Sequence, residues 1–250
     1  MTPEIWDFLL LAAVSVMVTI IAYLRHPLWK AFVLSFPLPF TLAALAVGEP
    51  LGAANVMALG LLFLYTYGVY LLRNRLRLNV LPAILLAAGG YCLVGVWLQG
   101  LLPKTESAFW LAVLAITTLA VLLRVNLGPR SEPGFRASLP LFLKLPVVLL
   151  VVTMLILLKS SLGGFMTLFP MVGVLASYKS RFSLWSNVRQ VPVIMLTLLP
   201  LMVTSRLLHE SLGLAASLGI GWVPFLLCLT PFLVGTRSAT RLSGGDAGAN

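Results

Sequence analysis

The sequence predicts an all-helical protein that crosses a membrane several times. Of its 250 residues, 60% are hydrophobic and only 10% are charged, and the mean hydropathy is +1.04. Soluble domains carry about 45–50% apolar and about 25% charged residues, so this chain has too few charges to cover a soluble surface. Its apolar residues form unbroken runs, as at 147–152, and not the alternating pattern of a membrane β-barrel. Helices are therefore the expected spanning elements.

Nine segments come close to the length of about 20 mostly apolar residues that a helix needs to cross the bilayer. The breaks between them combine charged residues with glycine or proline, as at Gly48–Pro50. The segment 161–178 contains Gly163, Gly164 and Pro170, so it is expected either to span the membrane or to re-enter on the same side. In chain order, the expected spans are 5–24, 28–47, 51–72, 79–98, 107–126, 138–158, 161–178, 188–205 and 215–236.

The positions of lysine and arginine predict the topology. Counted from the N-terminus, 13 of the 17 basic residues lie in odd-numbered loops or in the C-terminal tail. Three lie in even-numbered loops, and Lys144 lies within a span. Cytoplasmic loops are enriched in basic residues, so the N-terminus is expected in the periplasm and the C-terminus in the cytoplasm. Five of the seven acidic residues fall on the opposite, outer side.

The net charge of +10 therefore mostly reflects the basic residues of the predicted cytoplasmic loops. Nucleic-acid binding needs basic residues clustered on a soluble face, and here they are spread over short loops, so no nucleic-acid partner is expected. Basic loops such as Arg73–Arg77 are expected to contact anionic lipid headgroups. Topology control alone is the alternative role of these charges.

Similar features recur in the two halves of the chain and predict an internal repeat. Lys30 and Lys144 each lie in the first turns of a span, and Leu51-Gly52 matches Leu162-Gly163 at an offset of 111 residues. Chance similarity between two leucine-rich tracts is the alternative. Units with an even number of spans are parallel to each other. The predicted layout is a leading helix (1–26), four-helix repeat A (27–126), a cytoplasmic linker (127–137), four-helix repeat B (138–236) and a disordered cytoplasmic tail (237–250).

The most distinctive stretch of the second unit is LGGFMTLFPM, from Leu162 to Met171, which follows Lys144 and precedes Tyr178. Together these residues resemble the GlpM family of small bacterial inner-membrane proteins, whose four helices are about the length of one unit here. The resemblance covers residues 138–236, about two-fifths of the chain. The family has threonine where this chain has Met171, and histidine where it has Ser177. The resemblance implies a fused, duplicated GlpM-like protein, from a family linked to exopolysaccharide production.

The residues needed for catalysis are missing from the predicted spans. No Asp, Glu or His lies in the middle of a span, where ion-coupled transporters normally place such groups. No group of His, Cys, Asp and Glu has metal-ligand spacing, and the sequence contains no P-loop, dinucleotide glycine fingerprint or nucleophile elbow. We therefore expect no enzyme activity, no cofactor and no metal.

Lys144 is the most informative charge, because it lies about 9 Å into its span at 1.5 Å per residue. Its ammonium group is expected either to reach the cytoplasmic headgroups or to form an anion site together with Lys30. Prolines also interrupt several spans, and each frees a backbone carbonyl that must be buried or must line a cavity. Ordinary kinks and close helix packing are the alternatives. The candidate substrate-path residues are Lys30, Ser35, Pro37, Pro39, Asn55, Lys144, Gly163, Gly164, Thr167 and Pro170.

Two functions fit these observations. The first is a transporter or permease for a small solute, anionic or lipid-linked, in a bacterial inner membrane. The second is a non-catalytic accessory or scaffold subunit of an envelope (exopolysaccharide) biogenesis or transport complex, with a membrane-protein partner or a second copy of the chain. A transporter should have a polar, water-accessible cavity between the two units that contains Lys30 or Lys144. A scaffold should have a dry interface there and a broad exposed apolar face.

Overall fold

The structure, a computed structural model, describes residues 36–128, 161–168 and 183–245, with side chains up to 231 and some isolated helical residues elsewhere. Within these ranges every regular element is a helix, which confirms the predicted all-helical class. Three predicted segments fall largely outside these ranges: the leading helix 1–26, the linker 127–137 and the span 138–158.

The described helices begin and end close to the breaks that the sequence predicts. Four of them are long and apolar enough to cross a membrane, namely α4, α5, α6 and the Leu184–Pro231 part of α9. These lengths and compositions support the predicted membrane class. The elements are α3 (Leu38–Val47), α4 (Ala53–Asn74), α5 (Val80–Leu101), α6 (Glu106–Asn126), the 3-10 helix η1 (Gly163–Leu168) and α9 (Leu184–Gly245).

Local chemistry explains several of these boundaries. Gly48 ends α3 in the left-handed conformation, with φ of 72°, and its N–H donates to the carbonyl of Ala44. Thr105 caps α6 by accepting a hydrogen bond from the N–H of Ala108, and Glu106 lies in the first turn, where a carboxylate is favoured by the helix dipole. In α3, proline occurs only at the start, at Pro37 and Pro39, where no intrahelical N–H is needed, whereas α9 contains Pro192, Pro200, Pro224 and Pro231 in its interior.

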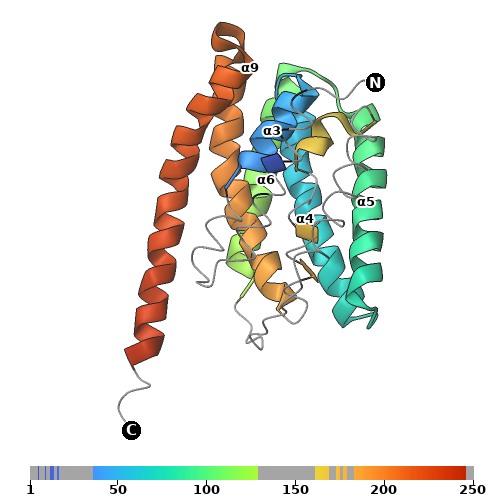
Figure 1. Cartoon of the computed structure of the whole chain (residues 1–250), viewed down its shortest axis with the longest axis vertical. Helices are drawn as coiled ribbons and strands as arrows, with labels where there is room; N and C mark the ends of the chain where they lie inside the picture. The colour runs from blue at the N-terminus through green and yellow to red at the C-terminus, as the bar shows by residue number, and fades with distance from the viewer. Residues whose placement is uncertain are drawn as a thin grey trace.

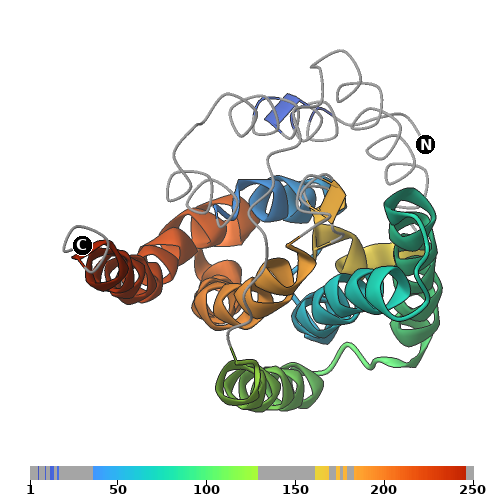
Figure 2. The same cartoon turned by 90° about the horizontal axis from the view of Figure 1, so that it is seen from below.

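The spanning helices run up and down beside one another (Figures 1 and 2). One end of the bundle carries the loops 48–52 and 102–105 and the break in α9 at Gly213, and it contains Glu49, Glu106 and Glu210; we call it the acidic end. The opposite end carries the loop 75–79 and the start of α9; we call it the basic end. The basic end contains Arg73, Arg75, Arg77, Arg124 and Arg189.

α9 is two helices joined at Gly213, where φ is 74° and ψ is 171°. The chain turns back there, so the predicted spans 188–205 and 215–236 lie on either side of the break (Figure 1). The two halves pack tightly: the hydroxyls of Ser205 and Ser217 are 3.1 Å apart, and a Cβ added to Gly221 would lie 2.9 Å from the carbonyl oxygen of Leu201. α9 stays helical to Gly245, beyond residue 237, where the tail was predicted to begin.

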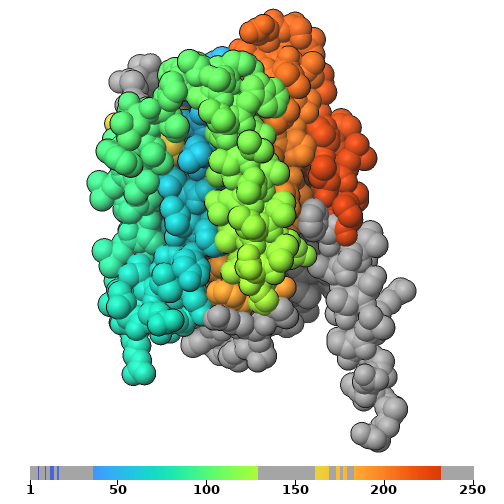
Figure 3. Space-filling model, turned by 180° about the vertical axis from the view of Figure 1, so that it is seen from behind, coloured from blue at the N-terminus to red at the C-terminus, as the bar shows by residue number. Residues whose placement is uncertain are grey.

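α4 forms the centre of the described core, with α5, α6, η1 and α9 packed around it, and α3 packs against η1. Its residues Val56, Leu59 and Val69 are fully buried. In contrast, α5 and α6 turn large apolar side chains outward, including Leu85, Leu93, Trp97, Leu111 and Leu114. Figure 3 shows these two helices side by side, with α4 visible between them. An apolar outer face and a tightly packed apolar interior are what a bilayer-embedded bundle requires.

Candidate functional site

η1 is the irregular element around which the site is built. It follows Leu162 and consists of GGFMTL, of which Gly164 to Leu168 are buried against α3, α4 and α5. Gly163 has φ of 48°, which favours glycine, and its Cα faces the amide of Gln99 on α5. A Cβ on Gly164 would lie 2.9 Å from the Cβ of Ala54, so only glycine lets η1 approach α4 this closely.

Side chains of α4 and α5 satisfy the backbone of η1. The Nδ2 of Asn55 donates to the carbonyl of Gly164 at 3.2 Å and to the Oγ1 of Thr167 at 3.3 Å. The Thr167 hydroxyl donates to the same carbonyl at 2.7 Å, and the hydroxyl of Tyr91 donates to the carbonyl of Phe165 at 2.8 Å. Irregular backbone inside a membrane protein needs such partners, because no water is present to replace them.

A cavity of about 240 Å³ lies next to η1 at the acidic end. Its lining comes from the end of α3, the α3–α4 loop, the first turn of α4, the end of α5, the α5–α6 loop, the first turn of α6, η1 and α9. The polar and charged lining residues are Glu49, Asn55, Gln99, Lys104, Thr105, Thr167 and Arg206. The cavity therefore lies between elements of the predicted repeat A and elements of the predicted repeat B.

Two ion pairs surround the cavity. Lys104 is 3.1 Å from Glu49, and both side chains are more than half exposed. Arg206 is 2.9 Å from Glu106, with the guanidinium side chain only 24% exposed. Exposed pairs of the first kind contribute about 0–1 kcal/mol to stability.

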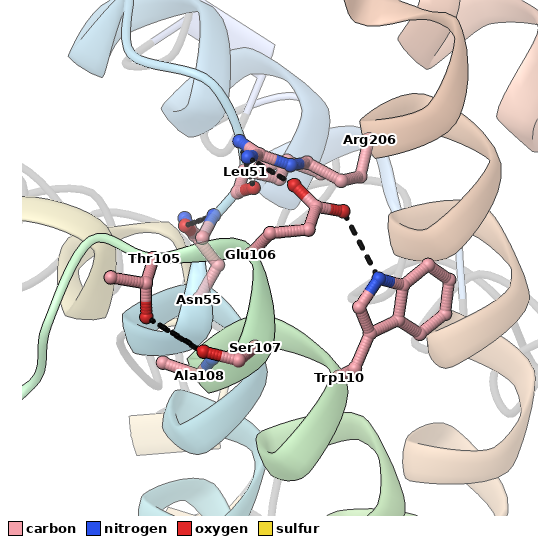
Figure 4. Close-up of polar contacts among 9 residues, drawn as sticks. Leu51, Asn55, Thr105, Glu106, Ser107, Ala108, Trp110 and Arg206 are labelled. Carbon is pink, nitrogen blue, oxygen red and sulfur yellow. Dashed lines mark hydrogen bonds and ion pairs between the residues drawn. The ribbon is translucent and has the colours of Figure 1, made fainter.

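Arg206 is the more firmly held of the two cations. It also donates to the carbonyl of Leu51 at 3.4 Å and stands 5.9 Å from the ring centroid of Phe109. Glu106 in turn accepts a hydrogen bond of 3.0 Å from the indole of Trp110, so the carboxylate lies between the guanidinium and the indole (Figure 4). The guanidinium is thus oriented by three neighbours, Glu106, Leu51 and Phe109, from two parts of the chain.

The structure brings together four of the predicted site residues. Asn55, Gly164 and Thr167 line the cavity, and Gly163 lies beside them against Gln99. Pro37 and Pro39 are elsewhere, at the start of α3, where the carbonyl of Pro37 accepts hydrogen bonds from the backbone and the hydroxyl of Thr41. The remaining candidates lie outside the described residues: Lys30, Ser35, Lys144 and Pro170.

Gln99, Lys104 and Arg206 are not among the predicted site residues. Lys104 and Arg206 are predicted as charges of the outer loops, and Gln99 directly follows the predicted span 79–98. One signal was present in the sequence: Lys104 and Arg206, two of the three basic residues in the outer loops, occur where acidic residues predominate. Basic residues in loops where acidic residues predominate are candidates for ion pairs, and this signal could have identified Lys104 and Arg206.

In the part of the chain that the structure describes, no three His, Cys, Asp or Glu side chains are grouped as metal ligands. Comparison with protein-family models, with curated proteins and with solved structures finds no match for this chain. The resemblance of residues 138–236 to the GlpM family therefore stays a prediction.

Proposed function

We propose that this chain is a transporter or permease of a bacterial inner membrane that takes up a small solute through the cavity beside η1. The observation that carries the proposal is the cavity itself, which lies between the two predicted repeats and has a polar, partly charged lining. Membrane transporters commonly bind their substrates at the interface between repeats, next to interrupted helices. The 3-10 helix η1 is such an interruption.

In this proposal the acidic end faces the periplasm and the basic end faces the cytoplasm. The described arginines at the basic end are Arg73, Arg75, Arg77, Arg124 and Arg189, in agreement with the excess of basic residues in cytoplasmic loops. The nine spans, the leading helix and the two parallel repeats belong to the same proposal. The cavity then opens a route for a solute that arrives from the outer side, and anionic lipids contact the arginines on the inner side.

The polar cavity favours this function over the accessory or scaffold subunit. A scaffold is expected to have a dry interface between its units, with an apolar face as its main feature. The apolar outer face of α5 and α6 is accounted for by lipid, since spanning helices must present such a surface to the bilayer.

Labelling of an introduced cysteine tests whether the cavity alternates between the two sides of the membrane. We replace Cys92 and Cys228 by alanine, introduce Thr167→Cys at the cavity, and treat right-side-out and inside-out vesicles with a charged, membrane-impermeant thiol reagent. A permease should be labelled at this position from both sides, because its binding site is exposed alternately. The matched control is Leu114→Cys on the exposed face of α6, which should resist labelling from either side.

Labelling of Thr167→Cys from the outer side alone would show a static cavity and would contradict transport. An absence of labelling from both sides would favour the scaffold alternative. Lys104→Cys and Arg75→Cys test the orientation in the same vesicles, because they should react from the outer and the inner side, respectively.

A further inference from the structure

Polar contacts join the two predicted repeats at two places beside the cavity. At the first, Asn55 of α4 donates to the carbonyl of Gly164 and to the hydroxyl of Thr167 in η1. At the second, Arg206 of α9 pairs with Glu106 at the start of α6. Both contacts connect predicted repeat A, with α4 and α6, to predicted repeat B, with η1 and α9. The cavity therefore adjoins two separate attachments between the repeats.

Arg206 makes the second attachment to two segments at once. Its Nη2 atom is 2.9 Å from a carboxylate oxygen of Glu106, and its Nη1 atom donates to the carbonyl of Leu51 at 3.4 Å. Leu51 lies just before the start of α4, and Figure 4 shows the Arg206 side chain extending from α9 toward it. Arg206 also lines the cavity. One side chain of α9 thus holds both the start of α6 and the segment before α4.

The two attachments differ in exposure to solvent. Asn55 and Thr167 are neutral, and they are only 5% and 3% exposed. The side chains of Arg206 and Glu106 are 24% and 57% exposed, so water and salt reach this ion pair. Exposed ion pairs contribute little to stability, whereas buried polar groups lose more when they are separated without new partners. The attachment through Arg206 therefore opens more readily than the attachment through Asn55.

We propose that Arg206 is the latch of an outer gate, which closes the cavity at the acidic end by holding α9 against α6 and the segment before α4. When Arg206 leaves Glu106 and Leu51, the cavity opens toward the outer side, while Asn55 still holds η1 against α4. This inference rests on the proposed function, because a gate has a role only where the cavity is exposed alternately to the two sides. It assigns the outward-opening step to one side chain.

The other ion pair at the cavity provides matched controls. Glu49 and Lys104 line the cavity and are 3.1 Å apart. They join the α3–α4 loop to the α5–α6 loop, and both loops belong to predicted repeat A. Glu49→Gln and Lys104→Gln therefore remove the same charges as Glu106→Gln and Arg206→Gln, without breaking an attachment between the repeats.

The rate of thiol labelling from the outer side measures the opening of the gate. The reporter is Thr167→Cys in the full-length chain without its native cysteines, in right-side-out vesicles with a cationic, membrane-impermeant reagent. Arg206→Gln should be labelled about fivefold faster or more than Lys104→Gln, because it loses both the ion pair and the bond to Leu51. Glu106→Gln should be labelled about twofold faster than Glu49→Gln, since only the ion pair is lost.

Two further measurements keep the test specific. In inside-out vesicles the labelling rate should not rise in Arg206→Gln, because Asn55 still joins α4 to η1. Ala53→Cys serves as a second reporter, since Ala53 also lines the cavity and is only 4% exposed.

Equal rates in Arg206→Gln and Lys104→Gln would overturn the proposal. A rise of the same size from the inner side would overturn it as well, because it would indicate a general loosening of the bundle. If Arg206→Gln does not fold, the comparison of Glu106→Gln with Glu49→Gln decides the question. The proposed function fails by a different result, which is that Thr167→Cys in the otherwise unchanged chain is not labelled from the inner side.

Discussion

Replacing Asn55 by alanine tests the central polar contact of the fold. The amide of Asn55 connects the first turn of α4 to η1, which is 109 residues away along the chain at Gly164. It takes part in three hydrogen bonds, one of which it accepts from the N–H of Gly52 and two of which it donates to Gly164 and Thr167. Asn55 is buried, with 5% of its surface exposed, so water does not replace the two hydrogen bonds that its amide donates to Gly164 and Thr167.

The expected loss of stability follows from what each partner retains. The carbonyl of Gly164 keeps its 2.7 Å hydrogen bond from Thr167, so neither of these two groups is left unpaired. The N–H of Gly52 loses its described acceptor, but Gly52 lines the cavity, where solvent can solvate it. Side-chain hydrogen bonds in membrane helices contribute about 0.6 kcal/mol each on average, so loss of all three lowers the free energy of unfolding by about 2 kcal/mol.

Reversible unfolding in mixed detergent and dodecyl sulfate micelles measures this free energy. The matched control is Asn126→Ala, which removes an exposed hydrogen bond between Asn126 Nδ2 and the carbonyl of Leu122 within α6. The control should change the unfolding free energy by less than about 0.5 kcal/mol, as surface substitutions usually do. If Asn55→Ala is no more destabilising than Asn126→Ala, the hydrogen bonds between α4 and η1 do not stabilise the fold, and the reasoning is refuted.

Three further substitutions test other parts of the structure. Gly221→Ala should destabilise the packing between the two halves of α9 by about 1–3 kcal/mol, because the new Cβ would lie 2.9 Å from the carbonyl oxygen of Leu201. The control Gly219→Ala has open space around it and should not destabilise them. Disulfide formation between Ser205→Cys and Ser217→Cys reports whether the two halves stay packed. Tyr91→Phe should lower the unfolding free energy by about 0.6–1.7 kcal/mol through loss of its bond to Phe165, whereas an equal effect of Tyr67→Phe would contradict this assignment. Glu106→Gln should leave the free energy of unfolding nearly unchanged, because the carboxylate is 57% exposed, and should shift the fluorescence of Trp110 relative to the control Glu210→Gln.

The helices were predictable because the bilayer imposes a length on each of them. The predicted spans 51–72, 79–98 and 107–126 correspond to α4, α5 and α6, since a run of apolar residues between charged or proline-containing breaks is a purely local signal. The irregularity of the chain around Gly163 was only partly predictable from its glycines, because Gly89 and Gly90 are also adjacent and lie inside the regular helix α5. The positive φ of Gly163 and the close approach of Gly164 to Ala54 distinguish the 3-10 helix η1.

The site was only partly predictable, because it depends on contacts between distant segments. Asn55 and Thr167 were recognisable as polar residues in apolar runs, but the sequence carries no signal that they pair with each other across 112 positions. Arg206 could not be assigned to Glu106 or to the cavity from sequence, because the two residues fall in separate predicted loops and a single charge has no periodicity. Helix docking, and not local pattern, decides which of these side chains meet.

The depth of the polar groups explains why the charged part of the site lies at one end of the bundle. A charge costs several kilocalories per mole at the bilayer centre and far less near the interface, so Arg206 and Lys104 are tolerated at helix ends. Asn55 and Thr167, which are neutral and satisfy each other, lie on the floor of the cavity. Beyond them the next turns of α4, at Val56 and Leu59, are fully buried against apolar neighbours. In the proposed transporter, a solute that enters the cavity would meet a closed apolar layer, and its passage would require η1 to separate from α4. The close approach of Gly164 to Ala54 makes that contact the point at which the two predicted repeats would have to part.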